Sequence, residues 1–318
     1  MTLAAAGEAD PNGSFLHDVL EGLAASPKRI PPKYFYDETG SRLFEEICRT
    51  PEYYPTRVEA ALLARIAPEV AEATPESAAL VEFGSGASEK TRSLLDAAPQ
   101  LAAYAPIDIS GAALAQAANR IAAAYPALQV IPVVDDFTLL ERLPPALSGR
   151  PKVGFFPGST IGNFAPPEAA ALLRRAKHLL GQGAHFLIGV DLAKSEAVLN
   201  AAYNDAAGVT AAFNLNLLAR INRELGGDFD LSAFSHRAFW NAREGRVEMH
   251  LVSARDQTVR VDGAAFAFRR DETIHTENSY KYDPEGFARL AQSAGWRVEQ
   301  MWTSPPPEFA AFLLREPR

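Results

Sequence analysis

The stretch Leu80-Val81-Glu82-Phe83-Gly84-Ser85-Gly86 decides the fold class of this chain. Residues 80–83 are apolar or compatible with a β-strand, and Gly84 and Gly86 permit a tight turn that brings the backbone close to a ligand. Residues 87–91 then open a helix, whose first N–H groups have no partners within the helix and face whatever lies over the turn. We interpret this stretch as a buried strand that leads into a cofactor-binding turn.

A Gly-x-Gly turn alone is a weak signal, and an acidic residue further along the chain strengthens it. Asp108 ends a second apolar run, residues 104–107, where a Rossmann-like fold places the carboxylate that accepts the ribose hydroxyls. The dinucleotide fingerprint also needs a third glycine, and this stretch, which continues with Ala87 and Ser88, lacks it. The difference favours a nucleoside cofactor without a pyrophosphate, and S-adenosylmethionine is the candidate.

Alternating apolar runs and amphipathic segments predict an α/β fold with a doubly wound sheet. The expected strands are 79–83, 104–109, 129–134, 152–157 and 185–191, with helices at 88–97, 111–124 and 167–180. A helix at 284–294 and strands at 296–302 and 309–314 close the sheet. Residues from about 195 to 280 form an insertion, with helices at 195–204 and 209–225 and strands at 238–240, 246–254, 257–261 and 266–269.

Composition limits the class of protein. The chain has 318 residues, 47% hydrophobic and 22% charged, enough for one large core and a second unit. Its net charge of −8 and pI near 5.4 argue against a nucleic-acid partner. No run of about 20 apolar residues predicts a membrane span, and residues 1–13 lack a secretory signal. The single cysteine, Cys48, excludes an intrachain disulfide, so we expect a packed thiol and a cytoplasmic protein.

The N-terminal 58 residues contain two unusual aromatic segments. A helix is expected at 14–25, and the segment 33–41 that follows fits neither a strand nor a helix, so it is either a core plug or a lid that brings tyrosine hydroxyls to a ligand. Prolines flank Tyr53 and Tyr54 and hold them in extended backbone. An amphipathic helix is expected at 58–73.

Ligands of doubly wound sheets bind at the carboxyl ends of the strands, where two further groups of residues stand out. Asp136 and Phe137 follow the third strand, at the place where an adenine is edge-bonded and stacked. Asn163 follows the fourth strand and precedes an aromatic residue, which resembles the Asn/Asp-Pro-Pro-aromatic signature of methyltransferases that act on amino nitrogens, with the two prolines absent here. Its amide oxygen can accept a hydrogen bond from an amine and aim the lone pair at a sulfonium methyl. The alternative is that Asn163 caps the helix at Pro166 and Pro167.

Four motifs together resemble the histidine-specific methyltransferase family of ergothioneine biosynthesis: YYPTR at 53–57, GSGASEKT at 84–91, FFPGSTIGN at 155–163 and IHTENS at 274–279. The resemblance covers nearly the whole chain from about residue 14. It implies a class I (Rossmann-like) methyltransferase sheet with a second, substrate-binding α+β domain. It also implies S-adenosylmethionine-dependent conversion of L-histidine to its Nα-trimethyl betaine, hercynine, by three successive methyl transfers.

The resemblance also implies site residues. Those for the cofactor are Gly84, Gly86, Lys90, Asp108, Asp136 and Phe137. Those for histidine are Tyr36, Tyr54, Asn163, Tyr203, Met249, Glu277, Asn278 and Ser279, with Asn163 and Tyr203 as catalytic residues. Asn278 departs from the apolar residue of some members. The implied domains are 59–194 with 281–318 for the cofactor and 14–58 with 195–280 for the substrate, and residues 1–13 are expected to be disordered.

The chemistry of these residue types agrees with this assignment. Glu277 can accept an imidazole N–H and Ser279 can serve the other ring nitrogen, although each also suits a solvated strand or turn. Tyr203 can reach the substrate carboxylate, unless its hydroxyl is simply solvated. Lys90 can neutralise the methionine carboxylate of the cofactor, or can be a solvated helix residue. The histidines at 178, 185, 236, 250 and 275 show no metal-ligand spacing, so no metal is expected.

Three alternatives remain open at this point. A sister methyltransferase acting on a tryptophan derivative would need an apolar pocket without an acid, which Glu277 argues against. A nicotinamide oxidoreductase is disfavoured by Ser88 and by the lack of a Tyr-x-x-x-Lys or His-acid pair. A cofactor-binding regulator without catalysis is the third. We expect L-histidine as the small-molecule partner, no nucleic acid, no membrane, and a monomer.

Overall fold

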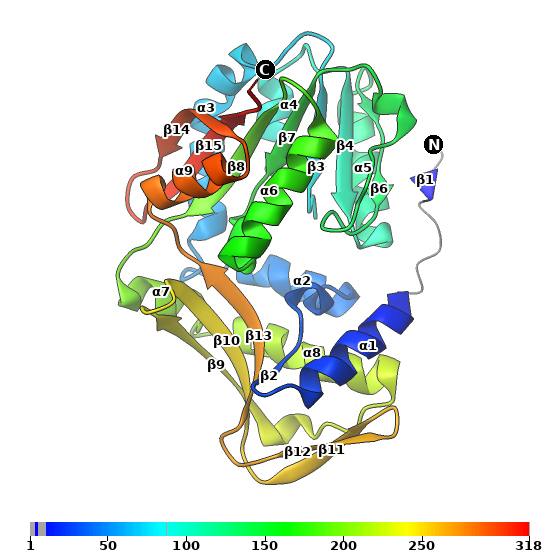
Figure 1. Ribbon diagram of the computed structural model, residues 1–318, viewed down its shortest axis with the longest axis vertical. Coiled ribbons are helices and arrows are strands. Elements are labelled where there is room, and N and C mark those ends of the chain that lie inside the picture. Colours follow the sequence, from blue (N-terminus) through cyan, green and yellow to red (C-terminus); the bar gives the residue numbers. More distant parts are fainter. Residues whose placement is uncertain (1–3, 6–10, 87, 318) are drawn as a thin grey trace. The chain divides into compact units, whose positions relative to one another are not determined.

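Strand β3 (Ala79–Phe83) lies in the middle of a large twisted sheet, and all five of its residues are buried. The computed structural model of the protein describes residues 4–5, 11–86 and 88–317. The chain forms two units, whose elements are labelled in Figure 1. Unit 1 draws on residues 1–8, 55–193 and 281–318, and unit 2 on residues 9–54 and 194–280. The sequence predicts the main boundaries at 58/59, 194/195 and 280/281.

The sheet of unit 1 has the strand order β1-β6-β4-β3-β7-β8-β15-β14, with β5 paired to β4. Its other strands are β1 (Ala4–Ala5), β4 (Ala103–Asp108), β5 (Gln129–Val130), β6 (Val133–Val134), β7 (Lys152–Phe156), β8 (His185–Asp191), β14 (Arg297–Thr303) and β15 (Phe309–Arg315). All pairs are parallel except those made by β15, which runs antiparallel to both β8 and β14. The chain moves outward from β3 to β4 and β6 and then returns to β7, so the strand order reverses between β3 and β7. Ligands bind at such a reversal in open α/β sheets.

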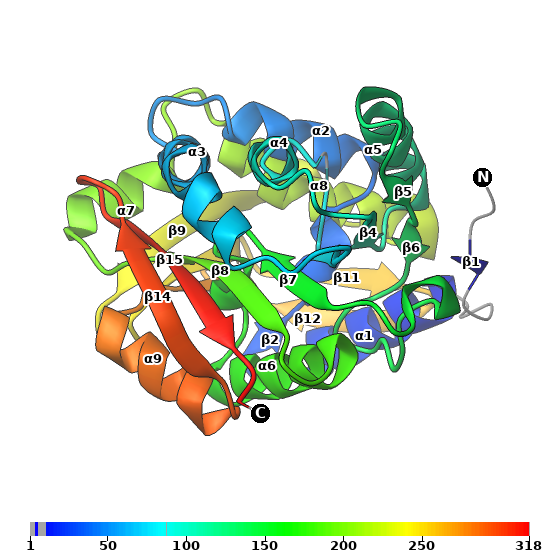
Figure 2. The ribbon, with the colours of Figure 1, turned by 90° about the horizontal axis from the view of Figure 1, so that it is seen from above.

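Helices cover both faces of this sheet (Figure 2). Helices α3 (Pro55–Glu72), α4 (Thr91–Ala97) and α5 (Gly111–Ala124) lie on one face, and α6 (Pro166–Leu180) and α9 (Pro284–Ser293) on the other. Val81 and Phe83 belong to the core under α6 and α9, whereas Leu80 belongs to the core under α3 and α4. Burial on both faces explains why the parallel strands are continuous apolar runs. A short 3-10 helix, η2 (Pro145–Leu147), precedes β7.

The structure differs from the sequence expectations at three places before residue 135. The expected strand 129–134 divides into β5 and β6 around Pro132, which has no N–H for the ladder. The expected helix 88–97 begins only at Thr91, because Ser88 has a left-handed backbone with φ of 55°. Residues 1–13 were expected to be disordered, but Ala4–Ala5 pair with Val133–Val134, and residues 11–13 begin helix α1 with Pro11 at a position that proline favours. Residues 1–3 and 6–10 lie outside the described part.

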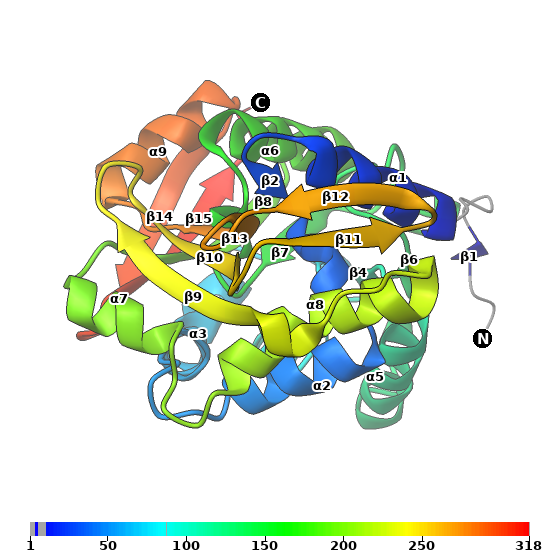
Figure 3. The same cartoon turned by 90° about the horizontal axis from the view of Figure 1, so that it is seen from below.

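Unit 2 combines two segments of the chain in a four-stranded sheet of order β2-β13-β10-β9 (Figure 3). Its strands are β2 (Lys28–Arg29), β9 (Phe234–Asn241), β10 (Arg246–Ser253) and β13 (Thr273–Tyr280), and β11 (Gln257–Val261) with β12 (Ala264–Phe268) form a separate hairpin. Its helices are α1 (Pro11–Ala24), η1 (Pro32–Phe35), α2 (Glu38–Ile47), α7 (Glu196–Ala202), α8 (Val209–Leu225) and η4 (Leu231–Ala233). Strand β13 is not among the strands expected from the sequence.

Asp37 begins helix α2 as its N-cap and connects this helix to α8. Its side chain accepts the Gly40 N–H at 2.7 Å, the Asn216 amide at 2.8 Å and the Arg223 guanidinium at 2.6 Å. The last two donors come from α8, so a single carboxylate joins α2 to α8. These hydrogen bonds hold the pKa of Asp37 below its usual value although burial opposes this.

No helix in the described part of the chain combines the length and the apolar character that a transmembrane segment requires.

Candidate active site

The turn after β3 is tied to the end of β4. The Gly84 N–H donates to the carbonyl oxygen of Ile107 at 2.9 Å, and the Gly86 N–H donates to Oδ2 of Asp108 at 2.9 Å. Both glycines have positive φ, and a Cβ at Gly84 would lie 3.3 Å from Cε1 of Phe137. Four residues predicted for the cofactor therefore gather around this turn, and the positive φ of the two glycines disfavours any other residue at their positions.

A buried carboxyl connects the strand before the turn to the helix after it. Glu82, in strand β3, accepts hydrogen bonds from the Tyr104 hydroxyl and, at 2.6 Å, from Oγ1 of Thr91, and burial raises its pKa to about 7. The Tyr104 hydroxyl also lies 2.9 Å from Oγ of Ser88, the residue with the left-handed backbone. Glu82 is not among the residues predicted from the sequence, although an acid inside a buried apolar strand is a detectable signal.

Lys90 forms an ion pair with Glu59 of helix α3. Glu59 is 1% exposed, and both of its oxygens also lie 2.8 Å from the Gly158 nitrogen in the loop after β7. Lys90 is thus not a freely solvated helix residue, and its ammonium already faces a protein carboxylate. Glu59 was missed because nothing in the sequence relates it to a lysine 31 positions later.

Asp136 and Phe137 occupy the loop after β6. Oδ1 of Asp136 accepts the Thr138 N–H at 2.8 Å and the Thr138 hydroxyl at 2.5 Å, which fixes the loop. The Phe137 ring packs edge-on, with centroid distances of 5.5–6.4 Å, against Phe83, Phe156 and Phe164. Because Phe164 follows Asn163 directly, this ring contact brings the loops after β6 and β7 together.

Asn163 ends a 3-10 helix, η3 (Thr160–Asn163), that lies between β7 and α6. The N-cap of α6 is Ala165, and its N–H donates to Oε2 of Glu168 at 2.9 Å. The alternative that Asn163 caps α6 is therefore wrong, since the capping position and its hydrogen bond belong to other residues.

Strand alternation separates the residues predicted for histidine. Met249 of β10 lies opposite Glu277 of β13, and Glu248 lies opposite Asn278. Because side chains alternate between the two faces of a sheet, Met249, Glu277 and Ser279 share one face and Asn278 projects from the other. The expectation that Asn278 joins Glu277 and Ser279 is thus not supported. The buried Oδ1 of Asn278 has no hydrogen-bond partner among the described residues.

Tyr203, at the end of α7, contacts the same strand. Its hydroxyl donates to Oγ of Ser279 at 2.7 Å, so two of the predicted residues meet directly. The ring of Tyr53 lies 6.2 Å from the Tyr203 ring. Burial, reinforced by Tyr203 and Glu277, raises the pKa of Tyr53 well above its usual value. Tyr53 therefore belongs to this group, although only its neighbour Tyr54 was predicted from the sequence.

Tyr54 itself has a different partner. Its hydroxyl accepts from the Lys194 ammonium at 2.9 Å, and the ammonium also lies 4.6 Å from the centre of the ring. Tyr54 and Lys194 are the last residue of one segment of unit 2 and the first residue of the other. This contact joins the two segments where the chain enters and leaves the unit.

The aromatic segment 33–41 is part of the core of unit 2. Phe35 is fully buried, with its ring 4.6 Å from that of Phe213. Tyr36 is partly exposed and packs edge-on against Phe44 and Phe213 at 5.7 and 5.8 Å. The core-plug alternative is correct for Phe35, whereas Tyr36 retains an exposed portion.

Residues 15–316 match the family model described as histidine-specific methyltransferase, SAM-dependent. The chain belongs to this family. It is 45% identical over 302 residues to a histidine N-alpha-methyltransferase of Mycolicibacterium smegmatis, with 93% of each chain covered. It is 42% identical over 301 residues to the protein of that name in Mycobacterium tuberculosis, again with 93% of each covered. A 4-dimethylallyltryptophan N-methyltransferase of Aspergillus fumigatus is 27% identical over 335 residues, covering 97% of this chain and 95% of that one.

Membership of the histidine-specific methyltransferase family confirms the predicted fold class, enzyme class and cofactor. The protein is an S-adenosylmethionine-dependent methyltransferase with a class I α/β sheet. The β-strand order agrees with this class, because the antiparallel β15 is inserted between β8 and β14 at the edge of an otherwise parallel sheet.

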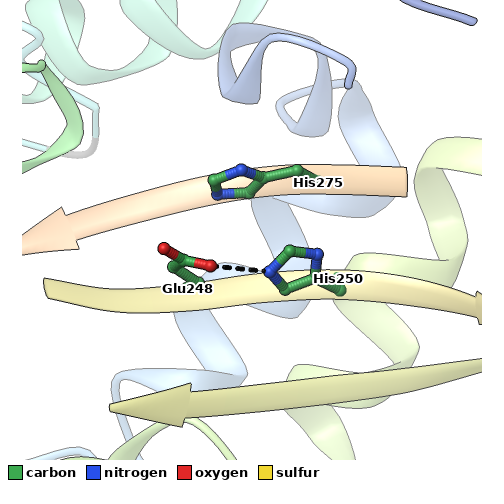
Figure 4. A group of neighbouring side chains, drawn as sticks. All are labelled: Glu248, His250 and His275. Atoms are coloured by element: carbon green, nitrogen blue, oxygen red, sulfur yellow. Dashed lines mark hydrogen bonds and ion pairs between the residues drawn. The ribbon is translucent and has the colours of Figure 1, made fainter. Parts of the chain in front are cut away.

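The histidine-specific methyltransferase also contains a side-chain cluster that was not predicted from its sequence. Glu248, His250 and His275 place one ligand atom each within 4.8 Å of one another on β10 and β13 (Figure 4). Oε2 of Glu248 lies 3.0 Å from Nε2 of His250, and Oε1 accepts from Arg246 and Asn241 at 2.8 and 2.9 Å. Although burial opposes it, these hydrogen bonds lower the pKa of Glu248 to about 2. Burial lowers the pKa of both histidines.

The ring geometry of this cluster does not favour a metal. The rings of His250 and His275 are stacked, 4.6 Å apart and 20° from parallel. Imidazole lone pairs lie in the ring plane, so nearly parallel rings direct them past one another rather than toward one ion. The Arg246 guanidinium also competes with a cation for Glu248. The cluster is better described as a structural contact between β10 and β13. Glu248 is paired with Arg246 and His250, and the His275 ring stacks on the His250 ring.

Proposed function

We propose that this protein transfers three methyl groups from S-adenosylmethionine to the α-amino nitrogen of L-histidine and so forms hercynine, the first step of ergothioneine biosynthesis. The observation that carries this substrate is the arrangement on β13: Glu277 and Ser279 share one face, and Tyr203 donates to Ser279. A carboxylate and a hydroxyl at this spacing can serve the two nitrogens of one imidazole. The names of the relatives that are 45% and 42% identical support the same substrate.

Unit 1 is proposed to bind the cofactor. Asp108 accepts the ribose hydroxyls, Asp136 and Phe137 hold the adenine, and Gly84 and Gly86 allow the backbone to approach it. Lys90 serves the methionine carboxylate while it remains paired with Glu59. The already fixed positions of these side chains lower the cost of ordering them when the cofactor binds.

Unit 2 is proposed to bind histidine through Tyr36, Tyr54, Tyr203, Met249, Glu277 and Ser279. Met249 walls the side-chain pocket beside Glu277, with which it is paired across the strands. Tyr53 is added to this set on the basis of its contact with Tyr203. Asn278 projects from the other face of the sheet and is proposed to influence specificity only indirectly.

The mechanism proposed is direct in-line displacement. Bound S-adenosylmethionine supplies a methyl group activated by its sulfonium. The lone pair of the neutral amine forms the N–C bond as the C–S bond breaks, and the electron pair of that bond stays on sulfur. In the first two transfers Asn163 accepts a hydrogen bond from an N–H of the neutral amine and orients its lone pair; the dimethylated amine of the third transfer has no N–H left to donate. The proton that must leave before each transfer passes to water. Alignment of two reactants can supply roughly 7–11 kcal/mol of the barrier.

A tryptophan derivative is the second candidate substrate, because one relative bears the name of such an enzyme. Glu277 opposes this candidate, since the indole of a tryptophan derivative would suit an apolar pocket without an acid. Steady-state kinetics with histidine, tryptophan and tyrosine separate the candidates. We expect the highest kcat/KM for histidine, and a higher value for tryptophan would favour the second candidate. Cofactor binding without any turnover would favour the non-catalytic regulator.

The remaining proposals concern the surroundings of the enzyme. A monomer in the cytoplasm, without a nucleic-acid or membrane partner, is proposed from the acidic composition and the single cysteine. Size-exclusion chromatography with light scattering tests the monomer.

A further inference from the structure

Thr276 forms a β-bulge directly before Glu277. In the pairing of β10 with β13, Met249 lies opposite Glu277 and the next residue, His250, lies opposite His275. Thr276 is thus the extra residue of β13, and no residue of β10 lies directly opposite it in the strand pairing. A bulge of this kind redirects the side chains that follow it. The face on which Glu277 and Ser279 project is therefore set at Thr276.

A buried hydroxyl holds this bulge in place. Oγ1 of Thr276 lies 2.9 Å from Oδ1 of Asn214, which belongs to α8, and 3.1 Å from the carbonyl oxygen of Met249. A threonine hydroxyl has one hydrogen, so the two acceptors share it. Both Thr276 and Asn214 are fully buried. The bulge is consequently fixed to the helix behind it and to the strand beside it.

The Asn214 amide extends this connection to Tyr203. Nδ2 of Asn214 lies 3.1 Å from the carbonyl oxygen of His250, which only accepts hydrogen bonds, and this contact fixes the orientation of the amide. Nδ2 also lies 2.9 Å from Nδ1 of His236, so Nδ1 is an acceptor and the ring proton is on Nε2. Nε2 then donates to the carbonyl oxygen of Tyr203 at 2.9 Å.

The other side of the bulge is fixed by the cluster of Figure 4. Nε2 of His275 lies 3.0 Å from the carbonyl oxygen of Glu277. This contact joins the residues on either side of Thr276. The His275 ring is stacked on His250, and Glu248 holds His250. The backbone on both sides of Thr276 therefore has a side-chain support.

We propose that Asn214 and Thr276 are positioning residues for histidine, acting through Tyr203, Met249 and Glu277. The inference rests on the proposed function, in which those three residues contact the substrate. The network reaches the Tyr203 and Met249 backbones by hydrogen bonds and the Glu277 backbone through the neighbouring Thr276. Neither Asn214 nor Thr276 is itself assigned a contact with the substrate.

The test compares Thr276→Val, which removes the hydroxyl at nearly constant shape, with Thr276→Ser, which keeps it. Calorimetry gives the Kd of L-histidine in the presence of S-adenosylhomocysteine and the Kd of S-adenosylmethionine alone, and kinetics give KM and kcat. For Thr276→Val we expect the histidine Kd and KM to rise about tenfold. The Kd of S-adenosylmethionine should be unchanged, and Thr276→Ser should restore most of the histidine affinity.

The matched control is Thr74→Val in unit 1, where the buried hydroxyl donates to the Val70 carbonyl at 2.8 Å. It loses the same kind of hydrogen bond, so its stability should fall while its histidine Kd stays that of the wild type. Asn214→Asp is a second variant, which keeps Oδ1 and removes both amide donors, and the same rise in Kd is expected. This variant decides the question if Thr276→Val does not fold.

Wild-type activity separates this inference from the proposed function. If the wild type does not methylate histidine, the proposed function fails. If the wild type does so, and Thr276→Val or Asn214→Asp binds histidine within twofold of it, the positioning network is overturned. An equal loss of affinity for histidine and for S-adenosylmethionine would also overturn it, because such a result indicates a general structural defect.

Discussion

Glu59 joins two loops of unit 1, because its buried carboxylate binds both the Lys90 ammonium and the Gly158 N–H. Lys90 precedes helix α4, and Gly158 begins the loop that leads to Asn163. The two loops belong to the neighbouring strands β3 and β7, between which the strand order of the sheet reverses. A single side chain from α3 thereby fixes both loops at the proposed cofactor end of the sheet.

We expect Glu59→Gln to destabilise the protein by about 3 kcal/mol, the low end for removing one partner of a buried ion pair, since the Lys90 side chain is 19% exposed and can be partly hydrated. The Kd of S-adenosylmethionine should rise as well. Urea unfolding and calorimetry measure these effects. Glu46→Gln is the control, because it removes an exposed helical ion pair with Arg42 and should cost only about 0.3–0.5 kcal/mol. Equal costs for the two variants would contradict the role of Glu59.

Glu82 gives stability a specific pH dependence. Its pKa is about 7 in the folded protein, against 4.5 for the free side chain, so the folded state holds the proton more tightly. The resulting stabilisation is complete below pH 4.5 and is lost as the pH rises through 7. The glutamine of Glu82→Gln cannot ionise. Between pH 5 and pH 8 the unfolding free energy of the wild type should therefore fall by about 1–3 kcal/mol relative to that of this variant. The unfolding free energies of the two proteins are measured with urea across this range. If they change with pH in the same way, Glu82 does not titrate.

Asn163→Ala should lower kcat roughly 100-fold while the Kd of S-adenosylmethionine stays near the wild-type value, because a misaligned amine loses the benefit of orientation. Glu168→Ala is the matched control. It removes the acceptor of the Ala165 N–H at the start of α6, so it should cost stability and leave kcat intact. Near-normal turnover in Asn163→Ala would remove this residue from the mechanism.

Glu277→Gln should raise the KM of histidine roughly 10- to 100-fold, since a hydrogen bond to a charged group contributes about 1.5–3 kcal/mol. The Kd of S-adenosylmethionine should not change. Asn278→Ala, one residue further along β13 and on its other face, should have a much smaller effect. A larger effect at Asn278 than at Glu277 would reverse the assignment of the two faces.

Dialysis against EDTA should leave turnover unchanged, because methyl transfer needs no metal and the stacked rings of His250 and His275 do not converge on one ion. Turnover with and without the chelator is the measurement. A loss of activity that zinc restores in the wild type, but not in His275→Phe, would make the Glu248 cluster a metal site.

The sequence predicts the sheet of unit 1 well, because both faces of its parallel strands are buried and the strands are continuous apolar runs separated by amphipathic helices. Strand β13 was missed, since its bulge at Thr276 breaks the alternation and polar residues occupy much of it. Its functional candidates, Glu277 and Ser279, were found only through the family resemblance.

The other site residues that were not predicted from the sequence depend on contacts that only the fold creates. Glu59 and Lys90 are 31 residues apart, and His250 and His275 meet only because β10 and β13 are paired. Tyr53 and Tyr54 are neighbours in the sequence with equal chemistry, and only the fold shows that one packs on Tyr203 and the other binds Lys194. Spacing along the chain carries no information about such partners.

The most direct test of the proposed function is mass spectrometry of L-histidine incubated with the purified protein and S-adenosylmethionine, with tryptophan and tyrosine in parallel reactions. Histidine should gain three methyl groups, all on the α-amino nitrogen, and the other two amino acids should remain unmodified. Unmodified histidine together with a methylated tryptophan or tyrosine would contradict the substrate assignment.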